Sequence, residues 1–180
     1  MGNREHHATA PHTIAVAVLT LSDSRTPAED RSGDAIVALL EAAGHAVTGR
    51  VLVREDPPVI RAALEAALAG PAQAIILNGG TGIAPRDSTP EIVGALLERE
   101  LPGFGELFRY VSLGEIGTST VQSRALAGLA NRTLVACMPG STNACRTAWT
   151  RILEPQLDSR TRPCNFVQHL GSAEQCGRRA

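Results

Sequence analysis

Hydrophobic and polar positions along this chain alternate between the patterns of strands and those of helices. Residues Thr13 to Thr20 form a near-continuous apolar run, which is typical of a strand buried on both faces of a sheet. Strands are also predicted at Ala46 to Val53, Ala74 to Leu77 and Thr133 to Met138. Short apolar runs of this kind are consistent with buried strands of a central sheet.

Helical spacing of apolar residues separates the predicted strands. Residues Ser32 to Ala43 predict a helix that stops at Gly44, and Asp56-Pro57 opens a second helix that stops at Gly70. The segment Phe104 to Gly117 is less regular and is predicted to be neither helix nor strand. Three further helices are predicted at Pro90 to Glu100, Thr120 to Ala130 and Ala144 to Leu153.

This alternation predicts the α/β class, with a mostly parallel sheet covered by helices on both faces. The 180 residues, of which 43% are hydrophobic, suffice for one well-packed core, and we place a single domain at residues 13–170. Residues 1–12 are polar and are predicted to be a disordered tail. Residues 171–180 are predicted to be a second tail.

The charged residues exclude several classes of chemistry. All 17 basic residues are Arg, so there is no lysine for a Walker-type phosphate site, a Schiff base or a lysine-linked nucleotidyl intermediate. Any phosphate must therefore be bound by Arg, by backbone N–H groups or by a metal ion. The net charge of −1 indicates neither a nucleic-acid partner nor a membrane partner.

The cysteine and histidine pattern indicates a reducing compartment rather than a metal cage. Cys137, Cys145, Cys164 and Cys176 form no Cys-x-x-Cys pair, and the His residues lack metal-ligand spacing. The N-terminus lacks the apolar run of a signal peptide, and no apolar stretch reaches membrane-spanning length. We therefore expect a cytoplasmic protein with reduced thiols.

Three polar, Gly-containing or Ser-containing loops follow predicted strands, namely Ser22 to Thr26, Asn78 to Asp87 and Pro139 to Asn143. Ligands of open parallel sheets bind beyond the carboxyl ends of the strands, where the strand order reverses. If the order is second, first, third and last strand, these loops converge on one pocket. Unpaired N–H groups in the Gly-rich turn favour a phosphate, although the same sequence also fits an ordinary strand-to-helix turn.

Several motifs in this chain, in their order and spacing, resemble the MoaB/MogA family of molybdenum cofactor biosynthesis proteins. The segment Glu115 to Ala125 resembles the MoaB branch in particular. The resemblance covers Thr13 to Leu170. The motifs that carry it are Asn78-Gly79-Gly80-Thr81-Gly82, Arg86-Asp87-x-Thr89-Pro90-Glu91, Pro102-Gly103-Phe104-Gly105-Glu106 and Met138-Pro139-Gly140-Ser141.

This resemblance implies a three-layer α/β/α fold that binds molybdopterin, a pterin dithiolene with a terminal phosphate. Active members of the family use ATP and a divalent ion such as Mg²⁺ to adenylylate that phosphate and release pyrophosphate. The family also implies a homo-oligomer, either a trimer or a hexamer. Molybdopterin and ATP or GTP are therefore the expected partners.

Two aspartates match the catalytic positions of the family. Asp87 follows the Gly-rich loop and is expected to hold Mg²⁺, although an acid just before a helix can also be purely structural. Asp56 resembles the second catalytic aspartate, but the neighbouring Glu55 leaves the register open by one residue. An Asp before Pro57 is also an ordinary helix N-cap.

The family resemblance also implies a set of residues that bind molybdopterin or nucleotide. Asn78 departs from the family, which usually has Thr there, and an additional amide donor can alter the turn or its ligand contacts. The expected binding residues are Ser22, Asp23, Asn78, Gly79, Gly80, Thr81, Gly82, Pro139, Gly140 and Ser141.

Two hypotheses of different class follow. The chain is either a Mg²⁺-dependent molybdopterin adenylyltransferase or a non-catalytic protein that binds molybdopterin or a nucleotide (GTP or ATP). Both aspartates favour the enzyme. Asn78 weakens that hypothesis, and the resemblance to the MoaB branch leaves the binding protein as the alternative.

Overall fold

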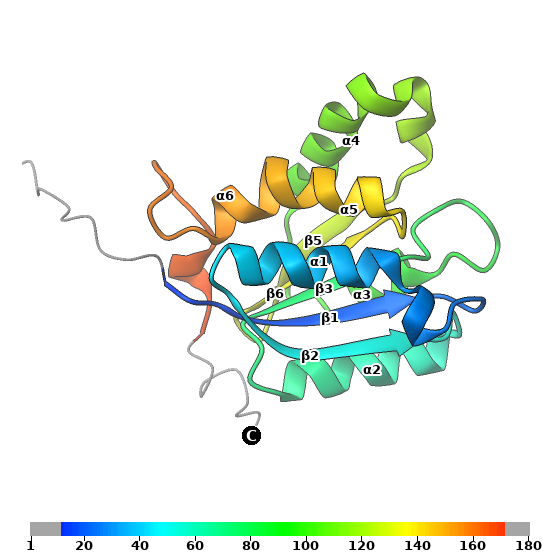
Figure 1. Ribbon diagram of the computed structural model, residues 1–180, viewed down its shortest axis with the longest axis horizontal. Coiled ribbons are helices and arrows are strands. Elements are labelled where there is room, and N and C mark those ends of the chain that lie inside the picture. Colours follow the sequence, from blue (N-terminus) through cyan, green and yellow to red (C-terminus); the bar gives the residue numbers. More distant parts are fainter. Residues whose placement is uncertain (1–11, 172–180) are drawn as a thin grey trace, which may run out of the picture.

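A computed structural model of the protein describes residues 12–171 and contains a six-stranded sheet with the order β2-β1-β3-β6-β5-β4 (Figure 1). The predicted order of the first four strands is confirmed, and these strands are parallel. The other two strands extend the sheet in antiparallel pairs. The strands are β1 (Ala15–Leu21), β2 (Ala46–Val53), β3 (Ala74–Asn78), β4 (Arg99–Glu100), β5 (Leu126–Ala130) and β6 (Thr133–Met138).

Helices cover both faces of this sheet, which confirms the three-layer α/β/α fold (Figure 1). The α-helices are α1 (Arg31–Ala42), α2 (Pro57–Ala69), α3 (Thr89–Gly94), α4 (Pro102–Ile116), α5 (Thr142–Ala148) and α6 (Glu154–Leu157). A π-helical stretch (Trp149–Leu153) joins α5 to α6, and short 3₁₀ helices lie at Pro27–Glu29, Gly117–Gln122 and Val167–His169. The two predicted tails, apart from His12 and Gly171, lie outside the described residues.

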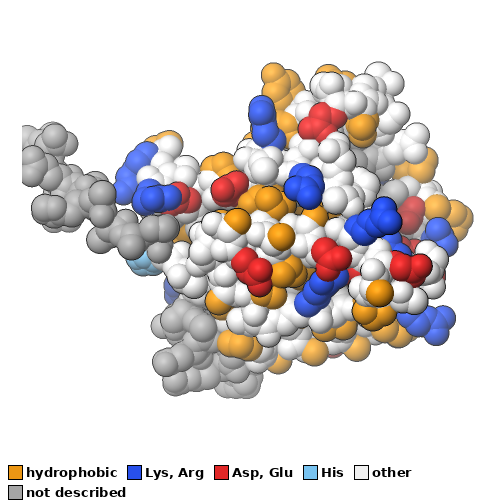
Figure 2. Space-filling view, in the orientation of Figure 1, with side chains coloured by type: hydrophobic (Ala, Val, Ile, Leu, Met, Phe, Trp, Pro, Cys, Tyr) orange, Lys and Arg blue, Asp and Glu red, His pale blue; other side chains and the backbone are white. Residues whose placement is uncertain are grey.

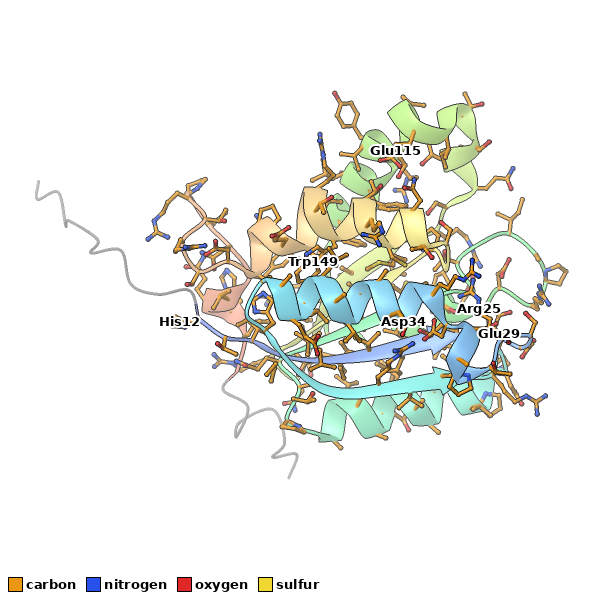
Figure 3. All side chains as sticks on the ribbon, viewed as in Figure 1. His12, Arg25, Glu29, Asp34, Glu115 and Trp149 are labelled. Carbon is orange, nitrogen blue, oxygen red and sulfur yellow. The ribbon has the colours of Figure 1, made fainter. Side chains whose placement is uncertain are left out.

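The core has two parts, one on each face of the sheet, because alternate strand residues point to opposite faces. On one face, Val16 packs in a cluster with Trp149 and residues of α1 and α4. On the other face, Leu19 packs with Leu64 and further residues of α2 and α3. Figure 3 shows Trp149 close to α1. Two apolar layers therefore hold the strands in place and fix where their carboxyl ends lie.

The prediction that Phe104 to Gly117 lacks regular structure is wrong, because this segment forms most of α4. Pro102 begins the helix, and Phe104 and Phe108 are buried one turn apart. Apolar side chains also lie on the exposed face of α4, so the sequence shows no clear amphipathic stripe.

Two predicted helices are also wrong in type or extent. The segment Thr120 to Ala130 ends a 3₁₀ helix and then forms β5, which pairs with β6 across a tight turn. Its Ala and Leu residues suit a helix, but pairing with a buried neighbour outweighs that preference. The helix predicted at Pro90 to Glu100 ends at Gly94, because the following residues enter β4 at the edge of the sheet.

The described cysteines differ in environment. Cys137 on β6 and Cys145 on α5 are buried, whereas Cys164 is exposed, and all three are free thiols. Burial raises the pKa of Cys137 and of Cys145 to about 12. Within residues 12–171, no helix is long and apolar enough to cross a membrane.

A buried carboxylate links helix α1 to three strands. Asp30 is 1% exposed, caps α1 by accepting from the Gly33 N–H, and pairs with Arg50 of β2 at 2.9 Å. Burial acts to raise the Asp30 pKa, but hydrogen bonds from Gly33, Thr20 and Arg50 outweigh it, so the pKa is lowered. Thr20 of β1 in turn accepts from the Asn78 side chain of β3 at 3.0 Å.

We expect Asp30→Ala to lower the free energy of unfolding by about 3 kcal/mol, because it removes a helix cap and leaves Arg50 without its buried partner. Asp34→Ala is the matched control. Asp34 pairs with the same Arg50 but its side chain is 59% exposed, so the expected loss is at most about 1 kcal/mol. Urea unfolding of both variants measures the difference.

The Asp30 contribution should also depend on pH. Because folding lowers the Asp30 pKa, the stabilisation is present above the unfolded-state pKa and is lost as the pH falls through the folded-state pKa. The stability of Asp30→Ala should therefore fall less steeply in acid than that of the wild type. Equal losses in Asp30→Ala and Asp34→Ala would contradict this account.

Candidate functional site

The loops after β1, β3 and β6 meet at the carboxyl ends of these strands. The Gly79 N–H donates to the Met138 carbonyl at 2.9 Å, and Gly140 packs against Gly79. Arg25, which follows β1, donates to the Gly140 carbonyl at 3.1 Å and to the Ser32 hydroxyl at 2.8 Å. Figure 3 shows Arg25 at this edge, and Figure 2 shows acidic and basic side chains gathered over it. Segments from three distant parts of the sequence thus form one surface.

Glycine is required at two positions of the loop after β3. Gly79 and Gly80 have φ values of 117° and 62°, which side chains rarely tolerate. A Cβ atom on Gly79 would lie 2.3 Å from the Leu21 carbonyl oxygen, and one on Gly80 would lie 2.3 Å from the Thr89 hydroxyl. The turn therefore brings its backbone closer to neighbouring segments than any larger residue would allow.

This turn leaves consecutive backbone donors unused. Within residues 12–171, the N–H groups of Gly80, Thr81 and Gly82 form no hydrogen bond. Successive unpaired N–H groups in a turn make a concave site that favours an anion such as a phosphate. Three of the expected binding residues, Gly80, Thr81 and Gly82, therefore have backbone donors that are available to an anion.

Arg124 fixes the other half of this loop. Its backbone N–H donates to the Thr81 carbonyl at 3.0 Å, and its Nε donates to the Gly82 carbonyl at 2.8 Å. The guanidinium group also contacts the Asp87 carbonyl and the Glu91 carboxylate. Arg124 was no candidate in the sequence, because it lies about forty positions from the loop and no local pattern links them.

Asp87 closes a turn within the loop. Its Oδ2 accepts from the Ala84 N–H at 2.8 Å, and its own N–H donates to the Ala84 carbonyl at 2.9 Å. Its Oδ1 has no hydrogen-bond partner among the described residues. The half-buried carboxylate thus has a structural contact and one oxygen that is free to bind a cation.

Glu55 lies next to two other carboxylates of this edge. The Asp23 Oδ1 accepts from the Glu55 N–H at 2.9 Å, and Arg86 Nε lies 3.8 Å from Glu55 Oε2. Partial burial raises the pKa of the Glu55 carboxyl, and Asp23 and Asp87 also raise it, whereas Arg86 and Arg25 lower it. Glu55 therefore shares its electrostatic environment with both aspartates.

Asp56 occupies a different position from Glu55. It is exposed and stands at the N-cap of α2, and its side chain makes no capping hydrogen bond. The charge of Glu55, the other acid left open by the sequence, interacts with that of Asp87. The family motif alone does not distinguish the two residues, because they are neighbours and the register is open by one position.

Three buried oxygen atoms beside the Gly-rich loop lack partners. They are Asn78 Oδ1, Ser88 Oγ and Thr89 Oγ1, and each is without a hydrogen bond in the described part of the chain. Thr89 also donates its N–H to the Gly80 carbonyl, so these atoms belong to the same loop and the helix start behind it. Because buried polar groups are nearly always paired, these atoms are available to a ligand or to water.

The remaining candidate residues serve mainly to shape their loops. The Ser22 hydroxyl accepts from the N–H groups of Ser24 and Arg25 at 3.3 and 3.2 Å. The Ser141 hydroxyl caps α5 by accepting from the Ala144 N–H at 3.2 Å, and Pro139 with Gly140 leads into that cap. Both serines therefore lie at the site, and their hydroxyl oxygens already accept hydrogen bonds from neighbouring N–H groups.

A cavity of about 450 Å³ lies beside Arg124, between α4 and the start of β5. Glu106, Arg109 and Val121 line it together with Arg124. No group of three or more His, Cys, Asp or Glu side chains in residues 12–171 is arranged to hold a metal ion. Mg²⁺, however, usually binds proteins through one or two carboxylates, with water and phosphate as its other ligands. Asp87 and Glu55, whose charges interact, are the carboxylates of this edge that could hold such an ion.

Comparison with known proteins identifies the family of this chain. A family model described as "Probable molybdopterin binding domain" matches residues 17–159. Molybdenum cofactor biosynthesis protein B of Escherichia coli (strain K12) is 50% identical over 156 residues, which cover 86% of this chain and 92% of that protein.

Solved structures with the same fold include proteins of both branches. A crystal structure of molybdenum cofactor biosynthesis protein B has a TM-score of 0.81 at 42% identity and covers 83% of this chain and 94% of its own. A MogA structure has a TM-score of 0.69 at 33% identity, and the match covers 79% of this chain and 97% of that chain.

The fold and the strand-end loops thus define an α/β protein of the molybdopterin-binding type. The chain belongs to the molybdopterin-binding domain family, and its similarity to molybdenum cofactor biosynthesis protein B extends over most of both chains.

We expect Arg124→Gln to loosen the loop at residues 81–91, because it removes a charged group that contacts two carbonyls and Glu91. The free energy of unfolding should fall by about 2 kcal/mol. Amide hydrogen exchange should rise mainly within that loop. Arg61→Gln is the matched control, since Arg61 makes only an exposed pair with Glu65 and should cost at most about 0.5 kcal/mol. Unchanged exchange at Ala84 and Asp87 would count against the assignment.

Proposed function

We propose that this protein binds molybdopterin through the loop at Gly79 to Gly82 and acts in molybdenum cofactor biosynthesis. The observation that carries the proposal is the run of unpaired N–H groups at Gly80, Thr81 and Gly82, which suits the terminal phosphate of the pterin. The names of similar proteins, molybdenum cofactor biosynthesis protein B among them, support the same pathway.

The reaction that fits the carboxylates is adenylylation of molybdopterin by ATP. A phosphate oxygen of molybdopterin would attack the α-phosphorus of ATP, and the bond to the pyrophosphate leaving group would break. When bound, a divalent ion such as Mg²⁺ supplies neutralisation of the phosphate charges. Asp87, through its free Oδ1, and Glu55 would hold that ion. Its positive charge would offset the burial and the repulsion from Asp23 and Asp87 that raise the Glu55 pKa.

The second candidate function is binding of molybdopterin or a nucleotide, ATP or GTP, without catalysis. Two observations favour it. One oxygen of Asp87 is already bound to the Ala84 N–H, and Asn78, in place of the usual Thr, directs its amide group toward Thr20. Both functions use the same donors at Gly80 to Gly82, so they differ in turnover rather than in the binding site.

Asp87→Asn separates the two functions. The amide keeps the size of the side chain and can still accept from the Ala84 N–H, but it removes the charge that a hard divalent ion needs. If the protein is the enzyme, molybdopterin affinity should change little while adenylyl transfer falls at least about a hundredfold. Single-turnover assays with molybdopterin, ATP and Mg²⁺ measure both. Absence of turnover in the wild type would leave the binding function.

The neighbouring acids supply a matched pair for the same assay. Glu55→Gln should lower turnover about tenfold or more, since its carboxylate lies in the field of Asp87. Asp56→Asn should have the larger effect if the second catalytic acid is Asp56 instead. The two substitutions are one position apart, and each removes one negative charge. The ratio of their turnover rates therefore assigns the second carboxylate.

We further propose that the protein is a homo-oligomer, either a trimer or a hexamer. Tyr110 and Ile116 on α4, with Val121 just beyond it, are 74%, 52% and 77% exposed. Leu107 and Leu113 of the same helix are 43% and 49% exposed. An apolar surface of this kind on one helix is typical of a contact between subunits.

Replacing Tyr110 and Ile116 together by Ser should weaken self-association, because it removes apolar area from the centre of that surface. Sedimentation velocity at micromolar concentration should show a smaller species than the wild type. Val59→Ser, on an exposed position of α2, is the control and should leave the assembly unchanged. A monomeric wild type would rule out the proposal.

A further inference from the structure

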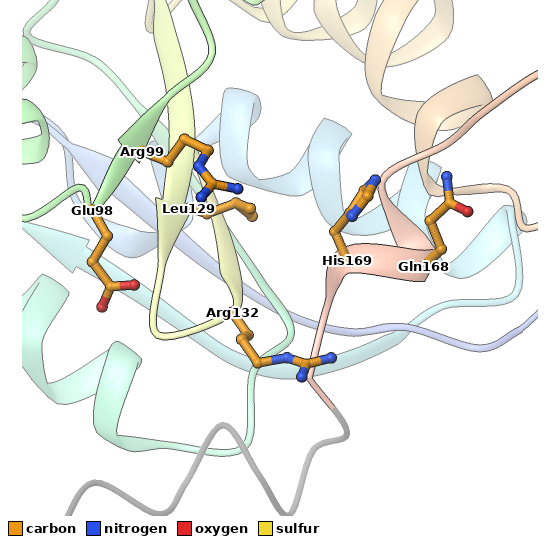
Figure 4. A pocket seen from close by; sticks show the side chains of 6 residues that line it. All are labelled: Glu98, Arg99, Leu129, Arg132, Gln168 and His169. Atoms are coloured by element: carbon orange, nitrogen blue, oxygen red, sulfur yellow. The ribbon is translucent and has the colours of Figure 1, made fainter.

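A second cavity lies at the other end of the sheet from the Gly-rich loop. It has a volume of about 400 Å³, within the usual range for small-molecule sites. Figure 4 shows Glu98, Arg99, Leu129 and Arg132 on one side of it, at β4 and the β5–β6 turn, and Gln168 and His169 on the other side. Arg132 precedes β6 whereas Met138 ends it, so the strand separates the two sites by roughly 17 Å or more.

The backbone at Arg132 points to a role for its side chain. Asn131 and Arg132 both have positive φ, at 49° and 59°, in the turn between β5 and β6. Glycine is the preferred residue at the second position of such a turn, and a long side chain there is unfavourable. The Arg132 Nη2 donates to the Leu170 carbonyl at 3.3 Å, which holds the guanidinium group at the cavity.

The charges that line this cavity favour a monoanion. Within the described residues, the Arg99 guanidinium group forms no ion pair or hydrogen bond. The single acidic side chain of the lining, Glu98, accepts from the Asn131 N–H at 3.0 Å. Two guanidinium groups and one carboxylate leave a net charge of +1 when His169 is neutral. A single negative charge would balance the site.

An apolar cavity of about 160 Å³ adjoins the charged one and shares Leu129 and His169 with it. Leu101 and Phe166 also line it. Asn165, which also lines it, is 7% exposed and has an unpaired Oδ1. The two cavities together present a charged end, an apolar end and an unused hydrogen-bond acceptor.

We propose that these adjoining cavities bind a small organic monoanion, with a carboxylate held by Arg99 and Arg132 and a flat apolar body against Leu129 and Phe166. The site is separate from the loop that we propose for molybdopterin and does not depend on it. Arg and carboxylate groups match in geometry, and an apolar floor strengthens such a pair by excluding water.

Calorimetric titration of the full chain with three matched probes tests this assignment. 2-Naphthoate combines the anion with the flat apolar body, acetate has the anion alone, and 2-naphthalenemethanol has the body alone. At about 5 mM, where a site of millimolar affinity is mostly occupied, we expect binding of 2-naphthoate and at least tenfold weaker binding of the other two. Backbone amide shifts in NMR spectra should change at Leu129, Arg132 and His169.

Two variants and one control assign the site to its residues. Arg99→Gln should weaken 2-naphthoate binding by about tenfold, the loss expected for one charge-assisted hydrogen bond. Arg132→Gly should weaken it similarly while the melting temperature stays the same or rises, because glycine suits a φ of 59°. Arg146→Gln removes one positive charge from α5 and should leave binding unchanged.

Several outcomes would overturn the proposal. They are no binding of 2-naphthoate at about 5 mM, equal binding of the neutral probe, and amide shifts confined to Gly79 to Gly82. Equal affinity in Arg99→Gln, Arg132→Gly and Arg146→Gln would overturn it as well, since the guanidinium groups would then have no role.

Discussion

The close approach of backbone to backbone at Gly79 is the constraint on which the strand-end surface depends. Gly79 lies against the Leu21 carbonyl on one side and Gly140 on the other, and its N–H is bound to Met138. Three loops can meet only because no side chain separates them at this point. The apolar layers on both faces of the sheet align the strands, but the glycines decide how near the strand ends can come.

The surface that results has two electrostatic parts. The Gly-rich turn offers backbone donors to an anion, whereas Asp23, Glu55 and Asp87 offer carboxylates to a cation. Each part alone is unfavourable, because the unpaired donors lack hydrogen bonds and the neighbouring carboxylates repel one another. A ligand of opposite charge stabilises each part. A phosphate bound with a divalent ion would satisfy both at once, which is why the enzyme and the binding protein are the two functions that fit.

The sequence could predict the elements whose signals are local. Short apolar runs identified the parallel strands, and the Gly-rich motif located the loop after β3, since both depend on neighbouring residues. Helix α4 was missed because its apolar residues serve both the core and the outer surface. Arg124, Arg25 and Glu55 could not be assigned from the sequence, because their contacts join residues far apart in the chain.

The different exposure of the cysteines has a consequence for the chemistry of a sulfur-containing ligand. A dithiolene that has been oxidised to its disulfide is open to attack by a protein thiolate, which forms a mixed disulfide and releases the second sulfur as a thiolate, and such attack needs an accessible protein thiolate. Cys137 and Cys145 are buried and, with pKa values of about 12, almost entirely protonated at neutral pH. Both lie on elements next to the strand-end surface, so the cysteine sulfur that the protein places there is unreactive toward such a disulfide.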